Sequence, residues 1–309
     1  MAWARSILAG ERPGPMVELV SVDSMAVYRG MDIGTAKPTP AQRREFPIHL
    51  VDLVEPHEDF AVAEFQALGR EAMASIVHRG HRPLLVGGTG LYLRALVDNL
   101  SFPGRFPEAA RDLEARLDAA GEPGSPEELA ELARLHDELV RRDPVAAERI
   151  DPANRRRLVR ALEVVEGSGV PFSASGPGLE RYPESDLLLV GLSVPIEVLH
   201  ERIARRFATW MEDGLLDEVR RIREQGGFSR TARQALGYRE LLAHLDQGVA
   251  LEDAVDEAVR RTRIFAKRQM SWFARDPRIV WIDGEMTLDE QIEALLGVVS
   301  SPRHTTGRG

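Results

Sequence analysis

A carboxylate, Asp23, follows a short apolar run at residues 17–22 and opens a loop rich in polar side chains. Ligands of open parallel α/β sheets bind at the carboxyl ends of the strands, so this position suits a metal ligand, a substrate contact or a proton acceptor. The alternative is an Asp that only caps the following turn. Further on, residues 34–38 form either a second anion-contacting loop or a stretch in which Lys37 is a solvated surface residue.

A glycine-rich turn, residues 87–90 (GGTG), stands between a predicted strand and a predicted helix that begins at about Leu91. Glycines at such a position let backbone N–H groups and the helix dipole meet a phosphate, and Thr89 adds a hydroxyl. No Lys-Ser/Thr follows, so the turn is not a Walker A motif. A plain tight turn explains the same residues.

Basic side chains gather in three helical clusters, although the formal net charge of the whole chain is -9. An acidic chain has no global nucleic-acid footprint, so any such contact has to be local. The first cluster suits an anionic partner, because Arg opposes the dipole at a helix N-terminus. The second suits a phosphate clamp and the third, beside Trp272 and Phe273, an RNA surface. For each, the alternative is a solvated helix face with acidic neighbours. The clusters are Arg155, Arg156, Arg157 and Arg160; Arg202, Arg205 and Arg206; and Arg260, Arg261, Arg263, Lys267 and Arg268.

Several classes of chemistry are excluded by the residues that the sequence lacks. The 309 residues contain no cysteine, which rules out disulfides, thiolate metal sites and a cysteine nucleophile. The eight His show no metal-ligand spacing, and no G-x-S-x-G elbow occurs. No apolar run approaches the roughly 20 residues that span a bilayer, and we expect a cytoplasmic protein.

The elements that must position these residues alternate between strands and helices at both ends of the chain. This order predicts a parallel α/β sheet with right-handed crossovers. Between about 107 and 169 no strand pattern occurs, which predicts an all-helical insertion. We therefore expect an α/β core at 1–106 and 185–299, an insertion at 107–184 and a disordered tail at 300–309. Predicted strands are 17–22, 48–54, 83–86, 187–194 and 279–283; predicted helices are 65–78, one from 91, 107–120, 126–141, 154–166, 195–213, 215–225, 231–247 and 251–275.

Five segments, in this order, resemble the tRNA dimethylallyltransferase family, also called tRNA isopentenyltransferases. They are SVDSMAVYRGMDIGTAKP, LLVGGTGLYLRAL, DPANRRRLVRALEV, RQALGYRE and AKRQMSWF. The resemblance spans residues 17–281 and implies a P-loop kinase-like α/β core with a parallel sheet, a helical insertion that binds tRNA and a helical C-terminal part. It also implies transfer of a dimethylallyl group from dimethylallyl diphosphate, with Mg²⁺ as cofactor. The acceptor is N6 of the adenosine just 3′ of the anticodon, in tRNAs that read codons beginning with U. Separately, we expect a monomer.

The resemblance implies roles for particular residues. Asp23 is similar to the family's general base, which accepts the N6 proton, and the three residues after it would line the pocket of the flipped adenosine. Thr89 and Arg206 resemble the other two catalytic positions, and the diphosphate would be held by Thr89, Arg206 and Lys37. No metal ligand is assigned. The tRNA-binding residues implied are Asp23, Ser24, Met25, Ala26, Arg111 (on a looser local match), Arg156, Arg157, Leu158, Val159, Arg160, Ala235, Leu236, Gly237, Tyr238, Arg239 and Glu240.

One family motif is missing from the sequence. The family carries a P-loop of the form G-P-T-x-x-G-K-S/T that cradles the diphosphate, and no G-x-x-x-x-G-K-S/T occurs here. Residues 2–9 resemble the back half of the helix that follows this loop. We expect a late start of the chain, through a misassigned start codon or a truncated gene, and severely reduced activity. We also expect a missing central strand that leaves sheet edges open. The in-frame codons upstream of Met1 would test this.

Three other functions compete with this interpretation. An adenylate isopentenyltransferase would prenylate free AMP, ADP or ATP, but a free nucleotide needs neither the helical insertion nor the RQALGYRE segment. A P-loop kinase for small molecules needs the missing Lys even more. An inactive RNA-binding remnant would bind tRNA without binding the diphosphate.

Overall fold

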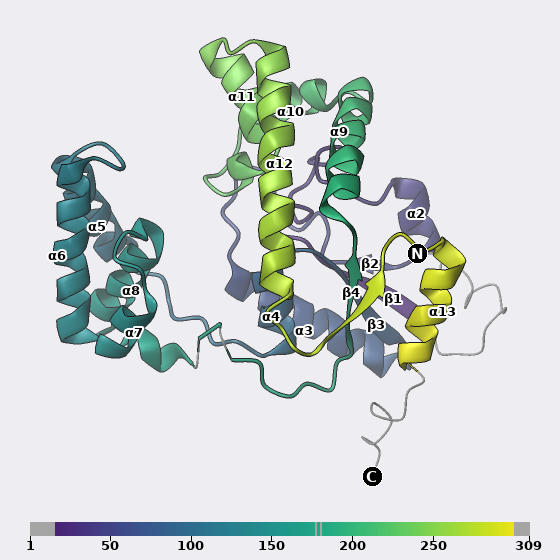
Figure 1. The fold of residues 1–309 in the computed structure, drawn as a ribbon, viewed down its shortest axis with the longest axis horizontal. Coiled ribbons are helices and arrows are strands. Elements are labelled where there is room, and N and C mark those ends of the chain that lie inside the picture. Colours follow the sequence, from purple (N-terminus) through teal and green to yellow (C-terminus); the bar gives the residue numbers. More distant parts are fainter. Residues whose placement is uncertain (1–15, 177, 180, 300–309) are drawn as a thin grey trace. The chain divides into compact units, whose positions relative to one another are not determined.

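The computed structural model describes residues 16–176, 178–179 and 181–299 and divides into two compact units (Figure 1). The first contains Met1–Asn99 and Glu184–Gly309, and the second contains Leu100–Pro183. Each unit has its own hydrophobic core. The helical second unit begins slightly before the predicted insertion at 107–184. The predictions for residues 2–9 and 300–309 lie outside the described residues.

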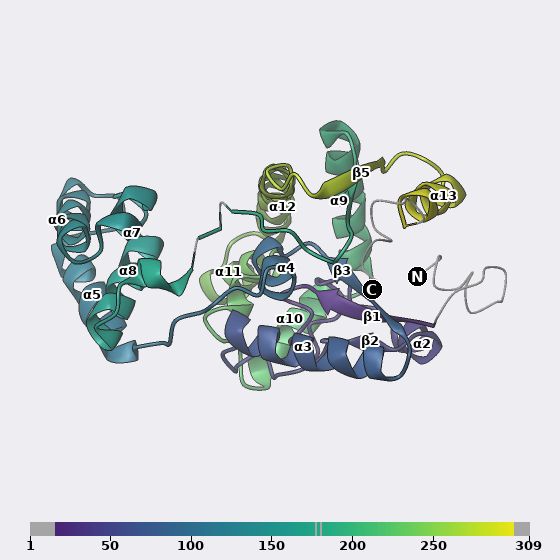
Figure 2. The same cartoon turned by 90° about the horizontal axis from the view of Figure 1, so that it is seen from below.

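The strands of the first unit are parallel, which confirms the predicted fold class. β1 (Val17–Val22) lies between β2 (Ile48–His49) and β3 (Arg82–Gly87), so it is nearly all buried. A central strand covered on both faces needs mostly apolar residues, which explains Val17, Leu19, Val20 and Val22, and Glu18 is the buried exception. Helix α3 (Val62–His78) lies along one face of this sheet (Figure 2).

β4 (Leu189–Ser193) and β5 (Ile279–Asp283) form a second, separate parallel pair. Within the described part of the chain, β3 and β4 therefore each keep one edge without a partner strand. Val86 on β3 and Leu192 on β4 are 52% and 53% exposed, which is unusual for apolar residues of parallel strands.

The remaining elements of the first unit are helical, and α12, α9 and α11 pack side by side (Figure 1). None of the helices described is both long enough and apolar enough to cross a membrane. The helices are α2 (Pro40–Glu45), α4 (Gly90–Val97), α9 (Ile196–Glu212), α10 (Leu215–Glu224), α11 (Tyr238–Gln247), α12 (Leu251–Phe273), α13 (Leu288–Val299) and the 3₁₀ turn η2 (Ala232–Gln234).

Two predicted elements of this unit are wrong in extent. The strand predicted at 48–54 ends at His49, because Leu50 and Asp52 adopt left-handed backbone conformations with φ of 64° and 54°. The helix predicted at 231–247 is broken at Gly237, whose φ is 87°, so that only Tyr238–Gln247 is α-helical.

The second unit is a bundle of helices around a core of leucines at helical spacing, such as Leu132, Leu135 and Leu139. The sequence analysis missed its short helix α7, which is capped by the buried Asp143. The Asp143 carboxylate accepts hydrogen bonds from the Ala146 N–H (3.0 Å) and the Ser173 hydroxyl (2.7 Å). The elements are α5 (Pro107–Ala120), α6 (Pro126–Arg142), α7 (Pro144–Arg149), α8 (Arg155–Ser168) and η1 (Phe172–Ser175).

A buried carboxylate on β1, Glu18, joins this strand to β2 and to the turn between α3 and β3. Its oxygens lie 2.6 Å from His49 Nε2 and 2.6 Å from His81 Nδ1, and they accept two hydrogen bonds from Arg79 Nη2. Burial by itself raises the pKa of Glu18, but the hydrogen bonds from His49, Arg79 and His81 outweigh burial and lower this pKa to about 2.

This cluster predicts a loss of stability in acid. A carboxyl whose pKa is lower in the folded state stabilises the fold above its unfolded pKa, and this contribution disappears as protonation sets in. For Glu18 the free energy of unfolding should therefore fall as the pH drops from 4.5 toward about 2. Urea unfolding of the wild type and of Glu18→Gln at several pH values measures this. The variant should be less stable at neutral pH and show a shallower acid slope; parallel curves would contradict the assignment.

Candidate active site

Asp23 follows the last residue of β1, and its carboxylate is fixed by the loop that it begins. Oδ1 accepts hydrogen bonds from the backbone N–H groups of Met25 (2.7 Å) and Ala26 (3.3 Å). The capping interpretation is thus confirmed for one oxygen. Oδ2 receives no hydrogen bond from any described residue, and the side chain is only partly buried. An oriented carboxylate with one free oxygen can accept a proton from a bound substrate.

Thr89 brings the glycine-rich turn next to this loop. Its backbone N–H donates to the Val22 carbonyl (3.2 Å), and its Oγ1 accepts from the backbone N–H of Ser24 (3.0 Å). Thr89 is also the residue before α4, so it stands at a helix N-terminus. The structure therefore joins Asp23, Ser24 and Thr89 at the carboxyl ends of adjacent strands β1 and β3.

The glycines of this turn are required for close packing, Gly88 and Gly90 against α12 and Gly87 against β1. A Cβ on Gly90 would lie 2.2 Å from Trp272 Nε1, and one on Gly87 would lie 2.1 Å from the Val22 carbonyl oxygen. Gln269 Nε2 donates to the Gly88 carbonyl (2.8 Å). The AKRQMSWF segment thus supports the GGTG turn, a role that the sequence analysis missed for Gln269 and Trp272.

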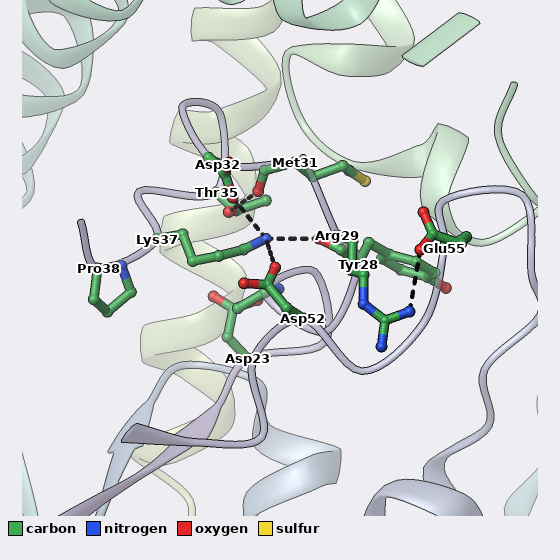
Figure 3. A network of polar contacts seen from close by, with 12 residues as sticks. Asp23, Tyr28, Arg29, Met31, Asp32, Thr35, Lys37, Pro38, Asp52 and Glu55 are labelled. Carbon is green, nitrogen blue, oxygen red and sulfur yellow. Dashed lines mark hydrogen bonds and ion pairs between the residues drawn. The ribbon is translucent and has the colours of Figure 1, made fainter. Parts of the chain in front are cut away.

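Lys37 is buried, with a side chain that is 0% exposed, and it binds groups of the protein itself (Figure 3). Nζ donates to the Tyr28 carbonyl (2.6 Å) and to Asp52 Oδ1 (2.7 Å), and it lies 3.0 Å from Asp32 Oδ1. The alternative of a solvated surface lysine is therefore wrong. These contacts also give no support to a diphosphate-binding role.

The RQALGYRE segment holds the loop that leads to Lys37. The buried Tyr238 hydroxyl donates to Glu218 (2.5 Å), which accepts from the backbone N–H groups of Asp32 (3.0 Å) and Ile33 (3.0 Å). Burial, together with the Glu218 carboxylate, raises the pKa of the Tyr238 phenol well above its ordinary value. No local pattern in the sequence marked Glu218, which is one acidic residue among several on α10.

Most side chains in this segment are therefore structural. Ala235, Tyr238 and Glu240 are buried. Gly237 is buried as well, and its backbone N–H donates a hydrogen bond to the Glu240 carboxylate (2.9 Å). Among the predicted tRNA contacts at 235–240, Leu236 is partly exposed and Arg239 is exposed, so these two are the ones that a tRNA can reach by side chain.

Arg206 is exposed on α9, where its guanidinium lies 4.9 Å from the centre of the Trp210 ring. Such stacking orients an Arg and leaves its N–H groups available. Among the described residues it has no hydrogen bond or ion pair. It is therefore a cation that can bind an anionic ligand.

In the second unit the predicted RNA-binding residues of α8 divide into a buried and an exposed set. Leu158 and Val159 are in the core, so the prediction that they contact tRNA is corrected for their side chains. Arg156 and Arg157 are exposed and have no ion pair with any described residue. Arg160 donates to the Pro103 carbonyl (2.7 Å) and pairs with Glu163.

Two further Arg of this unit that the sequence singles out, Arg155 and Arg111, differ in the same way. Arg155 forms ion pairs with Glu114, Asp118 and Glu128, which agrees with the alternative of a helix face with acidic neighbours. Arg111 is exposed on α5.

A metal ion has no preformed site in the part of the chain that the structure describes. No three His, Asp or Glu side chains come together there in an arrangement that could hold a metal. These residues therefore provide no protein-built Mg²⁺ site.

Comparison with known proteins identifies the family. The sequence profile of the IPP transferase family matches residues 26–276, most of the chain. The chain belongs to the IPP transferase family. Among curated IPP transferases, the tRNA dimethylallyltransferase of Streptomyces coelicolor is 45% identical over 92% of this chain and 88% of its own length. That of Desulforudis audaxviator is 46% identical over 87% and 84%.

A solved IPP transferase structure shares the fold. The tRNA isopentenylpyrophosphate transferase of Bacillus halodurans superposes with a TM-score of 0.65 and 36% identity, covering 96% of this chain and 90% of that one. Because these IPP transferases match nearly the whole chain, both units described above belong to the shared architecture.

Proposed function

We propose that this chain transfers a dimethylallyl group from dimethylallyl diphosphate to N6 of the adenosine just 3′ of the anticodon, in tRNAs that read codons beginning with U. The observation that carries the proposal is the Asp23 carboxylate. Two backbone N–H groups hold its Oδ1, its Oδ2 receives no hydrogen bond from a described residue, and Thr89 binds the neighbouring Ser24.

The proposed reaction is a substitution at the prenyl carbon. The N6 lone pair forms the new C–N bond while the C–O bond to the diphosphate breaks, and the diphosphate leaves with that electron pair. Asp23 Oδ2 accepts the proton that N6 loses. A positioned general base of this kind contributes a factor of about 10²–10⁴ to the rate.

The acceptor base has to leave its stack before it can react. Flipping a base costs a few kcal/mol and is easiest in a single-stranded loop, such as an anticodon loop. The exposed Arg156 and Arg157 of the second unit, and Arg239 of the first, are suited to bind the phosphates of the RNA. This local supply of cations is compatible with the net charge of -9.

The leaving diphosphate needs neutralisation of its developing charge. Arg206 and the Thr89 turn are the described groups that suit this role. Mg²⁺ remains part of the proposal as an ion that arrives with the diphosphate, since Mg²⁺ commonly binds through substrate phosphates. Its chemistry is charge neutralisation, and no step above depends on it. We also propose that the protein acts as a monomer in the cytoplasm.

The test is transfer of labelled dimethylallyl to hypomodified tRNA under single-turnover conditions, with enzyme in excess so that slow transfer is detected. We expect labelled N6-(dimethylallyl)adenosine at the position 3′ of the anticodon. Free AMP added as a competing acceptor should remain unlabelled. Labelling of AMP in preference to tRNA would show an adenylate isopentenyltransferase. Binding of tRNA with no transfer would show an RNA-binding remnant.

A further inference from the structure

The buried ammonium of Lys37 has all of its hydrogen-bonding capacity used within the protein. It has three donors, and three acceptors surround it: the Tyr28 carbonyl at 2.6 Å, Asp52 at 2.7 Å and Asp32 at 3.0 Å (Figure 3). With a side chain that is 0% exposed, it has neither a donor nor a surface for a ligand. Its effect on the site must therefore pass through the groups that it binds.

Those acceptors fasten the loop that begins with Asp23. Tyr28 ends the loop, and the turn that contains Asp52 pairs with it through backbone hydrogen bonds. The Asp52 N–H donates to the Ala26 carbonyl (3.1 Å), and the Leu53 N–H donates to the Val27 carbonyl (2.7 Å). Lys37 adds the side-chain link, because it joins the Asp52 carboxylate to the Tyr28 carbonyl.

The turn needs such a link because its backbone is strained. Asp52 has a φ of 54°, a left-handed conformation that a non-glycine residue keeps only when surrounding contacts impose it. Burial acts to raise the pKa of Asp52, but the hydrogen bonds from Lys37 and Arg43 prevail and keep this pKa below its ordinary value. The carboxylate thus remains ionised and continues to pair with Lys37.

We propose that Lys37 is a positioning residue for Asp23: paired with Asp52, it holds the Asp23–Tyr28 loop in the conformation that presents Oδ2 to the substrate. The catalytic part of this inference rests on the proposed function. It replaces a diphosphate-binding role for Lys37, and the two roles predict different kinetics.

The Lys37→Met variant separates these roles. Loss of positioning should lower kcat for prenyl transfer by about 100-fold, since a misplacement of about 1 Å has such an effect. KM for dimethylallyl diphosphate should stay within about twofold, because no ligand contact is removed. A raised KM with kcat unchanged would overturn the proposal and restore the diphosphate role.

Two further variants control this result. Asp52→Asn removes the partner charge, and an anionic residue is not a diphosphate ligand, so a fall in kcat shared by both variants supports positioning. Arg43→Met removes the other cation on Asp52 but leaves the Lys37 bond to Tyr28 intact. It should lose much less turnover than Lys37→Met; an equal loss would show that any cation beside Asp52 matters equally.

Chemical rescue tests the ammonium itself. The chain has no cysteine, so Lys37→Cys introduces a unique thiol. Alkylation with bromoethylamine in denaturant, followed by refolding, rebuilds a lysine-like side chain with sulfur in place of one methylene. We expect Lys37→Cys to show the low kcat of Lys37→Met and the aminoethylated protein to recover most of it. A refolded, aminoethylated protein with no recovery would contradict the proposal.

Amide hydrogen exchange makes the inference testable without catalysis. In Lys37→Met, without tRNA, the amides of Leu53 and Val54, which both donate to the Val27 carbonyl, should exchange about tenfold faster, because Lys37 no longer fastens the adjacent Tyr28 and Asp52. If the wild type transfers no prenyl group, the proposed function is wrong. Faster exchange in Lys37→Met would then still show that Lys37 tethers the loop. Unchanged exchange, in Lys37→Met or, if that variant does not fold, in Asp52→Asn, would overturn the tether.

Discussion

Replacing Asp23 by Asn is expected to lower the single-turnover rate of prenyl transfer by about 10²–10⁴-fold, the range that a general base contributes. The substitution removes only the proton-accepting oxygen, Oδ2. An Asn side-chain oxygen can still accept the hydrogen bonds that Oδ1 receives from Met25 and Ala26, so the loop keeps its cap. The second position, however, becomes an amide nitrogen that takes no proton.

The control for Asp23→Asn is tRNA binding, measured by filter retention or fluorescence anisotropy. Its Kd should change little, because the exposed Arg residues and the loop are intact. Asp23→Ala, which also loses the cap, should be no more active and should bind tRNA less well. Transfer by Asp23→Asn at more than about a tenth of the wild-type rate would rule out the general-base role.

Replacing Asp98 by Ala is expected to lower the free energy of unfolding by about 3–5 kcal/mol, as for other buried ion pairs that lose one partner. Asp98 follows the last residue of α4, and its side chain is 1% exposed. It contacts Arg94 on the same helix and Arg278 (2.6 Å), which precedes β5 and also pairs with Asp276 (2.7 Å). Without Asp98, two guanidinium groups remain in a poorly hydrated region without the carboxylate that they share.

Tryptophan fluorescence is the measurement suited to this prediction. Residues 100–183 of the second unit contain no Trp, and Trp210, Trp272 and Trp281 lie in the first unit, so urea unfolding followed by fluorescence reports on the unit that contains Asp98. Asp217→Ala is the matched control, since its carboxylate is 79% exposed and pairs with Arg220 on the same helix. Its effect should stay below about 1 kcal/mol. Equal effects of the two substitutions would refute a structural role for the buried network.

The elements that follow from local patterns were predictable from the sequence. The strand at 17–22, the helix at 107–120 and the strand at 279–283 match the structure residue for residue, because each is a single apolar pattern with Gly, Pro or charged residues at its ends. The strand predicted at 48–54 failed because Asp52 turns out of the extended conformation to meet Lys37, a contact over 15 residues that no local window contains. The helix predicted at 231–247 failed because its apolar period continues across Gly237, whereas the backbone at Gly237 leaves the helical conformation.

The residues that belong to the candidate site were easier to predict from the sequence than the roles of those residues. Asp23 and Thr89 both follow strands, and parallel strands place such residues at one edge of the sheet. Lys37 stands out in the sequence as a rare cation in a glycine-containing loop, yet charge alone does not tell a ligand from a buried partner of Asp52. The tRNA-binding assignments treated whole segments as surface, whereas Leu158, Val159 and Tyr238 are core residues that place their exposed neighbours.

The shielding of Lys37 also gives the folded protein an unusual response to amine-reactive reagents. The only other lysine is Lys267, which is exposed on α12. An activated ester should therefore acylate Lys267 quickly and Lys37 only when the loop opens. The slow appearance of a second acylated lysine, followed by mass spectrometry, would then time the opening of the loop that begins with Asp23 in the unmodified sequence.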